Sequence, residues 1–446
     1  MKVAVVGTGY VGLVSGVCLA ELGHEVRAVD LDAEKVNRIN RGESPIHEPG
    51  LSDLLARNLA SRFRATTSYA EALHGAAVSL IAVGTPFDGS RIDLTAVEQA
   101  SLSIGGWLGR QTGYQVVVVK STVVPGTTEG LVRQSLEKAS GRTAGRDFGL
   151  GCNPEFLTEG QAVADFMNPD RIVIGGLDQR SRDTLEELYR GFPGVPLVST
   201  NLRTAELIKY ASNALLATSI SFANEIADLC RALGGVDAMQ VMKGVHLSNY
   251  LSPRAPDGSR VLAPLAAFLE PGCGFGGSCL PKDVKALVAQ GKAMGEPVPL
   301  LGAVLEVNER RAQEVIGLIE HRFPSLSGLR VTVLGLAFKP DTDDVRESPG
   351  LRIAGLLAGR GARVTGYDPV ARPGSNGGPA LSLAPDLESA VAGAEVIVIA
   401  TRWDDFRALP ALLRGRSDQP LVVDGRRLLE PESVARYEGI GRKADP

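Results

Sequence analysis

The chain has 446 residues, of which 44% are hydrophobic and 22% are charged, the composition of a soluble globular protein with about three domains. A net charge of -4 without any Lys/Arg-rich run argues against a nucleic-acid partner and against binding to a membrane surface. The five cysteines form no CxxC pair and are too sparse for a disulfide scaffold, so we expect a cytoplasmic protein. No uninterrupted window is apolar enough to span a bilayer, so we expect no membrane partner.

A short β-branched run, Lys2–Val6, is followed by the sequence GTGYVG and by an apolar stretch that stops at Gly23. This order predicts a strand, a glycine turn and a helix. Gly7 would make the turn, Gly9 would let the backbone approach a pyrophosphate, and Gly12 would let helix and strand pack closely. Because free N–H groups at a helix N-terminus favour negative charge, the segment predicts a dinucleotide site.

The second predicted strand, Glu25–Val29, ends at Asp30. A carboxylate at this distance from the glycines is placed to bind the ribose hydroxyls of NAD, and it would repel the 2′-phosphate of NADP. We therefore expect NAD as the cofactor. Arg27 and Lys35 lie nearby and leave NADP as the alternative.

Two further predicted strands end in small polar residues. Residues 78–83 precede Gly84-Thr85-Pro86, and residues 116–119 precede Lys120-Ser121-Thr122. Ligands of an open parallel sheet lie beyond the carboxyl ends of its strands, so we expect Thr85 and Thr122 to face the dinucleotide. Turn formation and helix capping are alternative roles for both threonines.

A strand at 148–152 runs into the sequence NPEFLTEG, residues 153–160. Its two carboxylates, Glu155 and Glu159, are four residues apart and would lie beside the same site. A solvated acidic turn is the alternative interpretation.

One long helix is predicted from Leu202 to Leu233, because this stretch contains no proline or glycine and Gly234-Gly235 follows it. An apolar stripe at helical spacing should be buried, against another subunit as well as against the chain's own domains; it consists of Phe222, Ile226, Leu229, Cys230 and Leu233. Lys209 and Asn213 lie one turn apart, with Glu206 on the same face. We expect these polar residues to face a cavity, and a surface salt bridge is the alternative.

Residues 246–265 contain three prolines and an Asp-Gly pair, which predicts a loop. His246 has no companion at metal-ligand spacing, and we expect no metal site. The next segment, EPGCGFGGSCLPKD, spans residues 270–283. Its glycines let the backbone approach a ligand closely, and Lys282 and Asp283 beside Cys279 are surroundings that hold a cysteine as a reactive thiolate. A buried, unreactive cysteine is the alternative.

The last part of the chain repeats the pattern of its start. A strand is predicted at 329–334, and the residues from Ala358 to Asp368 match those from Ala20 to Asp30 in the order helix stop, strand, terminal aspartate. Strands predicted at 395–400 and 421–423 complete a second Rossmann-like sheet.

The second glycine turn differs from the first. Gly335 is kept, but Leu336–Pro340 replaces the other glycines, so a pyrophosphate could not sit on this backbone in the same way. Lys339 and Arg346 offer cationic side chains that could hold phosphates instead.

Six motifs in order resemble the nucleotide-sugar 6-dehydrogenases, the family of UDP-glucose and GDP-mannose dehydrogenases: GTGYVG, STVVPGTT, NPEFLTEG, AELIKYASNA, GFGGSCLPKD and LAFKPDTDDVRES. The resemblance implies an α/β fold with two Rossmann-like doubly wound parallel-sheet domains, joined by a long central helix and a small helical domain. The expected domains are an NAD-binding domain at 1–200, a central dimerisation domain with the cysteine loop at 201–310, and a nucleotide-sugar-binding domain at 311–446. It also implies a homodimer or higher homo-oligomer that oxidises the C6 alcohol of a nucleotide sugar to a carboxylate with two NAD+ and no metal.

The same resemblance implies roles for individual residues. Cys279 would be the nucleophile, assisted by Lys209, Asn213, Asp283, Glu155 and Thr122. NAD would contact Gly7, Gly9, Tyr10, Val11, Gly12, Asp30, Lys35, Thr85, Pro86, Ser121, Thr122, Glu159 and Arg346. The nucleotide sugar would contact Glu155, Phe156, Leu157, Lys209, Asn213, Arg260, Phe268, Glu270, Gly274, Phe275, Gly276, Lys339 and Arg426.

The expected reaction is oxidation of UDP-glucose to UDP-glucuronate through a cysteine thiohemiacetal and a thioester. Members that use UDP-glucose carry a short Arg-Ile-Gly segment just ahead of the cysteine loop, whereas here a longer, proline-containing run separates Arg260 from Phe268. GDP-mannose, UDP-N-acetylhexosamine and another nucleotide of glucose are therefore alternative substrates. Two rival functions are a one-step alcohol dehydrogenase, which would need no thiol, and an inactive NAD-binding regulator.

Overall fold

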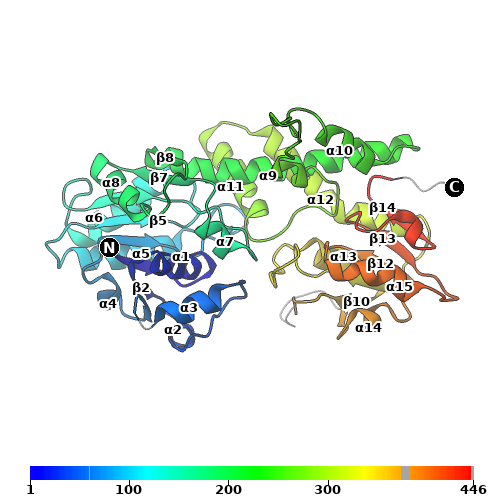
Figure 1. Ribbon diagram of the computed structural model, residues 1–446, viewed down its shortest axis with the longest axis horizontal. Coiled ribbons are helices and arrows are strands. Elements are labelled where there is room, and N and C mark those ends of the chain that lie inside the picture. Colours follow the sequence, from blue (N-terminus) through cyan, green and yellow to red (C-terminus); the bar gives the residue numbers. More distant parts are fainter. Residues whose placement is uncertain (60, 373–380, 443–446) are drawn as a thin grey trace. The chain divides into compact units, whose positions relative to one another are not determined.

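The computed structural model describes residues 1–59, 61–372 and 381–442. The chain forms two compact units, Met1–Ser212 and Asn213–Pro446, each built around its own sheet (Figure 1). The boundary falls inside the long helix α9, Leu202–Leu233, whose bounds are those predicted. The division into domains at 1–200, 201–310 and 311–446 stays a prediction.

The first unit contains an eight-stranded sheet with the order β3-β2-β1-β4-β5-β6-β7-β8. Its strands are β1 (Lys2–Val6), β2 (Glu25–Val29), β3 (Phe63–Thr66), β4 (Val78–Ile81), β5 (Val116–Val119), β6 (Gly149–Cys152), β7 (Ile172–Gly176) and β8 (Leu197–Thr200). The predicted strands are confirmed, and neighbouring strands are parallel except β6 and β7, which pair in antiparallel orientation. The strand order reverses between β1 and β4, the place where ligands bind to doubly wound sheets.

Helices cover both faces of this sheet because its strands are apolar on both sides. Val3 and Val5 of β1 belong to one core cluster with α1, whereas Ala4 and Val6 belong to another with α5. The helices are α1 (Tyr10–Glu21), α2 (Ala33–Asn40), α3 (Leu51–Leu59), α4 (Tyr69–Leu73), α5 (Thr95–Leu108), the π-helix η1 (Thr128–Val132), α6 (Arg133–Ser140), α7 (Ala162–Met167) and α8 (Gln179–Leu188). The alternation of side chains along β1 thus fixes which helix lies on which face.

The second unit contains a six-stranded sheet with the order β11-β10-β9-β12-β13-β14, and each described pairing in it is parallel. Its strands are β9 (Arg330–Leu334), β10 (Arg363–Tyr367), β11 (Ser382–Leu383), β12 (Val396–Ile399), β13 (Leu421–Asp424) and β14 (Tyr437–Gly439). The helices are α10 (Ala238–His246), η2 (Pro264–Phe268), α11 (Leu280–Met294), α12 (Pro299–Glu320), α13 (Pro349–Gly359), α14 (Leu387–Val391), η3 (Asp404–Ala408), α15 (Leu409–Leu413) and η4 (Pro431–Ser433). The second Rossmann-like sheet is therefore confirmed.

The apolar stripe of α9 is only partly buried within one chain. Cys230 is buried, whereas Phe222, Leu229 and Leu233 are 47%, 56% and 75% exposed. A helix presents only one side to a neighbouring element, and these three residues lie outside that side. Their burial against a second subunit stays a prediction.

The segment at 246–265 differs in part from the predicted loop. His246 is the last residue of α10, and Pro264 begins the short 3-10 helix η2. The proline at the first position of η2 suits a helix start, because that residue's N–H would have no partner within the helix.

Candidate active site

The glycine turn after β1 leaves space in which a ligand could approach the protein backbone. Gly7 has a φ of 97°, which side-chained residues rarely adopt. A Cβ on Gly12 would overlap the carbonyl oxygen of Gly7, so helix and strand could not pack as they do. A Cβ on Gly9, the N-cap of α1, would meet nothing within 4 Å. The open space beside Gly9 at the N-terminus of α1 fits the pyrophosphate of NAD, which N–H groups of the first helical turn could bind.

Asp30 is held at the carboxyl end of β2 by polar groups of the first unit. Its Oδ2 accepts hydrogen bonds from the Thr8 backbone N at 2.9 Å and the Thr8 Oγ1 at 2.6 Å, and it pairs with Lys35 Nζ at 3.1 Å. Burial raises the pKa of Asp30, but the hydrogen bonds from Thr8, Asp32 and Lys35 outweigh burial and lower it overall. The carboxylate is thus ionised and fixed where the sequence predicts ribose recognition.

Tyr10 joins the glycine turn to a carboxylate that sequence reasoning missed. The Tyr10 hydroxyl donates to Glu48 Oε2, and the Gly160 backbone N donates to the same oxygen at 2.8 Å. Burial, then the hydrogen bond to Glu48, raise the pKa of Tyr10. Because Glu159 directly precedes Gly160, this contact also fixes the position of Glu159 beside the turn. No local pattern around Glu48 could have indicated a partner 38 residues earlier.

The polar residues after β4 and β5 contact each other, and their contact with the dinucleotide stays a prediction. Thr85 Oγ1 donates to the Thr122 carbonyl oxygen at 2.8 Å, and Ser121 Oγ donates to the Val83 carbonyl oxygen at 2.7 Å. Pro86 follows Thr85, and its carbonyl oxygen accepts from the Asp93 N at 2.8 Å. These residues lie at the same edge of the sheet as the glycine turn, because β4 neighbours β1.

Glu155 and Lys209 form a buried ion pair. Glu155 Oε1 lies 3.1 Å from Lys209 Nζ, with side chains that are 7% and 6% exposed. Burial raises the pKa of Glu155, but Lys209, the Leu157 N–H and Lys120 outweigh burial and lower it overall. The Phe156 ring lies 5.5 Å from Lys209 Nζ. The alternative of a solvated acidic turn is therefore wrong for Glu155.

Cys279 is exposed and lies at the N-cap of α11. Its Sγ is 3.6 Å from Ser278 Oγ. Asp283, one turn later and 1% exposed, accepts hydrogen bonds from Asn213 Nδ2 at 2.6 Å and Lys282 Nζ at 2.6 Å. The alternative of a buried cysteine is wrong, and the reactivity of the thiol stays a prediction. The helix N-terminus favours a negative charge at this position.

A pocket of about 280 Å³ lies beside the cysteine loop in the second unit. It is lined by Ile220, Ala267, Phe268, Glu270, Pro271, Gly274, Phe275, Gly276, Leu280, Phe338, Lys339, Pro340, Thr401, Arg402 and Arg426. Seven of these are predicted substrate contacts: Phe268, Glu270, Gly274, Phe275, Gly276, Lys339 and Arg426. The pocket therefore gathers residues from segments that are far apart in the sequence.

Arg402 is a pocket residue that sequence reasoning missed. Its Nη1 donates to Glu270 Oε2 at 2.5 Å and its Nη2 donates to the Arg426 carbonyl oxygen at 2.6 Å. Arg426 Nε donates to the Ala400 carbonyl oxygen at 2.6 Å, and burial lowers the pKa of Arg426. Arg402 follows β12, so the rule that ligands lie beyond strand ends could have found it.

The loop that lines the pocket is fixed by a second missed residue, Asn308. Its Oδ1 accepts from the Phe275 N at 2.8 Å and its Nδ2 donates to the Phe275 carbonyl oxygen at 3.0 Å. A Cβ on Gly274 would overlap Asn308 Oδ1, and one on Gly276 would overlap the Glu347 carbonyl oxygen. The two glycines are therefore required for the close approach of the loop to its neighbours.

Two predicted ligand contacts are engaged elsewhere. Arg260 Nη1 donates to the carbonyl oxygens of Leu247 at 2.8 Å and Ser252 at 2.9 Å, and Arg260 does not line the pocket. Arg346 pairs with Asp344 at 2.7 Å in the second unit. Arg260 thus fastens its own loop, and contact of Arg346 with NAD stays a prediction.

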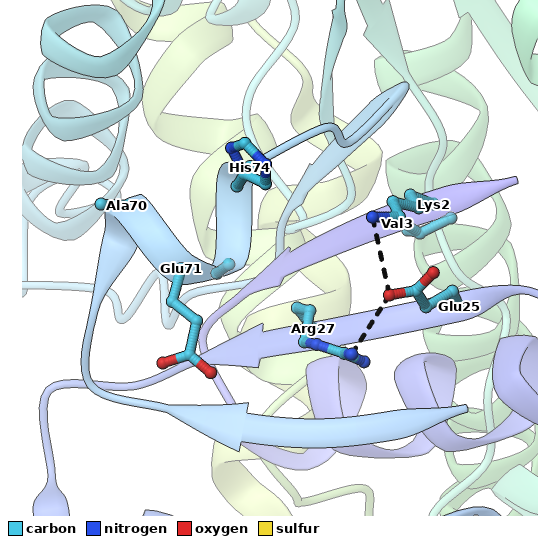
Figure 2. A pocket seen from close by; sticks show the side chains of 8 residues that line it. Lys2, Val3, Glu25, Arg27, Ala70, Glu71 and His74 are labelled. Carbon is cyan, nitrogen blue, oxygen red and sulfur yellow. Dashed lines mark ion pairs between the residues drawn. The ribbon is translucent and has the colours of Figure 1, made fainter. Parts of the chain in front are cut away.

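A hollow of about 410 Å³ in the first unit lies near the amino ends of β1 and β2 (Figure 2). Lys2 and Arg27 converge there on Glu25, at 3.8 Å and 3.1 Å. No predicted site residue lines this hollow, and the glycine turn lies at the carboxyl end of β1. It is therefore separate from the dinucleotide site.

The described residues contain no group of three or more His, Cys, Asp or Glu side chains that could hold a metal ion. Among the helices of the described part of the chain, none is long and apolar enough to cross a membrane.

Comparison with known proteins covers the whole chain. Residues 1–193, 203–310 and 332–431 match the NAD binding, central and UDP binding domains of the UDP-glucose/GDP-mannose dehydrogenase family. The UDP-glucose 6-dehydrogenase AglM of Haloferax volcanii is 40% identical, with 99% of this chain and 100% of the relative covered. A GDP-mannose 6-dehydrogenase of Pseudomonas putida is 38% identical over the same shares. The solved structure of a UDP-glucose dehydrogenase from Pyrobaculum islandicum superposes with a TM-score of 0.88, 38% identity, and coverage of 99% and 98% of the two chains.

Proposed function

Because the chain belongs to the UDP-glucose/GDP-mannose dehydrogenase family, an NAD-dependent family of nucleotide-sugar 6-dehydrogenases, we propose that it oxidises UDP-glucose at C6 to UDP-glucuronate. The observation that carries the mechanism is the exposed Cys279 at the N-cap of α11, one turn from the buried Asp283. A thiol in that position is what a four-electron oxidation of an alcohol needs.

The chemistry explains why a cysteine is required. Removal of a hydride and a proton from the C6 alcohol gives an aldehyde, which cannot readily release its remaining C6 hydrogen as hydride until a nucleophile adds to its carbonyl. Addition of the Cys279 thiol gives a thiohemiacetal, and loss of a second hydride and a proton from it gives a thioester. Water then cleaves the thioester, releasing the carboxylic acid and the thiol. The sum is two NADH for each sugar acid.

Polar residues on α9 and α11 would assist these steps. Lys209 and Asn213 lie one turn apart on α9 and both carry N–H donors suited to an alkoxide at C6. Asp283 accepts from Asn213 at 2.6 Å, which fixes the amide with its N–H group on the carboxylate side. Glu155, or a water held by Thr122 and Asp283, would take the proton from the alcohol.

The first unit would hold NAD, whose nicotinamide accepts the hydride. The backbone of Gly7–Gly12 suits the pyrophosphate, and Asp30 suits the ribose hydroxyls. Thr85, Pro86, Ser121, Thr122 and Glu159 line the sheet edge next to the turn and would contact the rest of the dinucleotide.

The pocket in the second unit suits the nucleotide sugar. Lys339, Arg402 and Arg426 are three cations against the single carboxylate of Glu270, a surplus of two positive charges. A nucleoside diphosphate sugar carries two negative charges on its phosphates, so the charges of pocket and ligand are complementary. The choice of UDP-glucose rests on relatives of that name at about 40% identity, and GDP-mannose is the alternative because a GDP-mannose 6-dehydrogenase is 38% identical.

The exposed apolar residues of α9 support assembly into a homodimer. Phe222, Leu229 and Leu233 form a row that a second copy of the chain could cover. The absence of disulfides among the five cysteines, all in the described residues, is compatible with the cytoplasm expected from their spacing.

The test is the yield of NADH and sugar acid from UDP-glucose, GDP-mannose and UDP-N-acetylglucosamine. We expect UDP-glucose to give two NADH per sugar consumed, and UDP-glucuronate as the product. Cys279→Ala should form no acid, whereas Cys230→Ala, a control at a buried cysteine of α9, should keep the normal yield. One NADH per sugar with an aldehyde product, or normal acid formation by Cys279→Ala, would contradict the mechanism. A higher kcat/KM for GDP-mannose or UDP-N-acetylglucosamine would mean that this nucleotide sugar, and not UDP-glucose, is the substrate.

A further inference from the structure

Lys120 is a buried lysine that the proposed mechanism does not use. It follows β5 directly and is 3% exposed. Its Nζ donates to Asn153 Oδ1 at 2.9 Å and approaches the Asn153 carbonyl oxygen at 3.4 Å, and it lies 5.9 Å from the centre of the Phe166 ring. A lysine is almost never fully buried unless its charge is paired, because removing an ammonium group from water is costly.

Asn153 links Lys120 to the turn that carries Glu155. Asn153 Oδ1 also accepts from the Tyr189 hydroxyl at 2.5 Å, and Asn153 Nδ2 donates to the Val173 carbonyl oxygen at 2.8 Å. The Asn153 side chain is therefore held from three directions. Glu155 is only two residues further along and pairs with Lys209. The fixed position of Asn153 therefore constrains the backbone from which the Glu155 side chain extends.

Two cations act on the Glu155 carboxylate. Lys120 and Lys209 interact electrostatically with each other and with Glu155. Burial raises the pKa values of the Cys152 thiol and the Tyr189 phenol, which are therefore neutral. The buried Glu206 of α9 also acts on Cys152, but burial raises its pKa and its oxygens accept from the N–H groups of Gly126 at 2.6 Å and Thr128 at 2.8 Å. Two cations beside Glu155 stabilise its carboxylate in the ionised form and an alkoxide that forms next to it.

We infer that Lys120 is a positioning residue for Glu155: it fixes the turn through Asn153 and adds a second positive charge to the Glu155–Lys209 pair. This role rests on the proposed function, in which Glu155 and Lys209 assist oxidation at C6. The direction of the pKa shifts agrees with it. Burial lowers the pKa of Lys120 to about 8, against the opposing effect of the Glu155 charge, and Lys120 contributes to the lowered pKa of Glu155.

A purely structural role for Lys120 predicts a different result, and the chain offers a matched control. Gln115 immediately precedes β5, at the opposite end of the same strand. It is buried, and its Nε2 donates to Ser79 Oγ at 2.7 Å. Gln115→Met removes a buried polar group from the same strand without touching the Glu155 turn, so it reports the cost of a lost buried contact alone.

The activity experiment compares Lys120→Met, Lys120→Arg and Gln115→Met as full-length chains with UDP-glucose and NAD. Lys120→Met should lower kcat by roughly 10- to 100-fold and leave the Kd for NAD within about twofold of wild type. Its acid limb of kcat against pH should move up by about one unit, because Glu155 becomes easier to protonate. Lys120→Arg should restore the position of the limb, and Gln115→Met should lower only Tm. An unchanged acid limb in Lys120→Met, or the same shift in Gln115→Met, would overturn the inference.

A second experiment needs no turnover and separates this inference from the proposed function. If wild-type protein oxidises no nucleotide sugar, the proposed function fails, and the charge coupling is then measured by thermal unfolding of Lys120→Met, Glu155→Gln and the double variant. Glu155→Gln should lower Tm more in the presence of Lys120, where it leaves two buried cations, than in the Lys120→Met background, where it leaves one. Equal shifts in both backgrounds would contradict the coupling. If Lys120→Met does not fold, Lys120→Gln replaces it in both experiments, because it keeps a hydrogen-bond donor without the charge.

Discussion

The turn after β1 and the turn after β9 share one packing contact and differ in how many of their N–H groups bind a carboxylate of the protein. A Cβ on Gly12 would overlap the Gly7 carbonyl oxygen, and a Cβ on Gly350 would overlap the Gly335 carbonyl oxygen in the same way. Gly7 and Gly335 have φ values of 97° and 96°. Both turns thus bring the following helix against the strand by the same means.

Both turns donate N–H groups to an aspartate, but the second donates more of them. After β1, Asp30 accepts from the Thr8 N at 2.9 Å. After β9, the carboxylate of Asp368 accepts hydrogen bonds from the Leu336 N at 2.8 Å and the Ala337 N at 2.9 Å, and it is 1% exposed. The helix that follows, α13, begins with Pro349, which has no N–H, and is capped by the Ser348 side chain. After β1, α1 begins at a glycine cap without a side chain.

This difference shows how one supersecondary unit serves two purposes. In the first turn the aspartate after the next strand, Asp30, accepts the N–H of Thr8, whereas in the second turn Asp368 accepts the N–H groups of both Leu336 and Ala337. Fewer N–H groups of the second turn are left for an anion, and the side chains of Lys339, Arg402 and Arg426 line the pocket of the second unit and could hold phosphates.

The largest difference between the two turns should appear when Asp30 and Asp368 are each replaced by alanine. Asp368→Ala leaves buried donors, the N–H groups of Leu336 and Ala337, without an acceptor and should cost about 1–3 kcal/mol for each. Asp30→Ala should cost less stability, because the Asp30 side chain is 15% exposed, but should weaken NAD binding roughly 10- to 100-fold. Urea unfolding and calorimetric titration with NAD measure the two effects. A higher Kd for NAD in Asp368→Ala, with an unchanged free energy of unfolding, would contradict the different roles of the two aspartates.

Alanine substitutions at Gly12 and Gly350 should show that only the first turn binds NAD. Gly12→Ala and Gly350→Ala should each lower the free energy of unfolding by about 1–3 kcal/mol or more, because in both the new Cβ meets a backbone oxygen. Gly12→Ala should also weaken NAD binding, whereas Gly350→Ala should leave the Kd for NAD unchanged. Equal loss of NAD affinity in both variants would mean that the second turn is not specialised.

Substitution of Arg402 tests whether side chains replace the helix N-terminus in the second unit. Arg402→Met removes one of the three pocket cations and should raise KM for the nucleotide sugar about tenfold or more, with KM for NAD unchanged. Steady-state kinetics with each substrate varied in turn measure both values. Arg407→Met is the control, because Arg407 is exposed and pairs with Asp404 outside the pocket. An equal rise in KM for the control would exclude a specific role for Arg402.

The smallest effect should be the pH dependence of stability contributed by Asp30. Its pKa is lower in the folded protein than in the unfolded chain, so its stabilisation is present above the unfolded pKa and is lost as the pH falls through the folded value. The difference in Tm between wild type and Asp30→Asn should therefore shrink between about pH 5 and about pH 3. A difference that stays constant over this range would mean that the contacts of Asp30 do not depend on its charge.

Local patterns in the sequence predicted most of the elements that position the candidate site. Lys2–Val6, Glu25–Val29 and Leu202–Leu233 have the predicted bounds, because periodicity, glycine stops and the absence of proline act within a few residues. The echo between the start and the end of the chain predicted the second sheet. The antiparallel pairing of β7 was not predicted, because the orientation of a strand depends on how the chain returns to the sheet.

The residues themselves determined which chemical groups this protein carries, a thiol flanked by glycines and a glycine turn followed by an aspartate. Only the tertiary structure decided their partners: Glu48 with Tyr10, Arg402 with Glu270, and Lys120 with Asn153. The members of these pairs are 38, 132 and 33 residues apart. No pattern local to either residue encodes such a contact, because it forms only when the packing of helices against the sheets brings distant segments together.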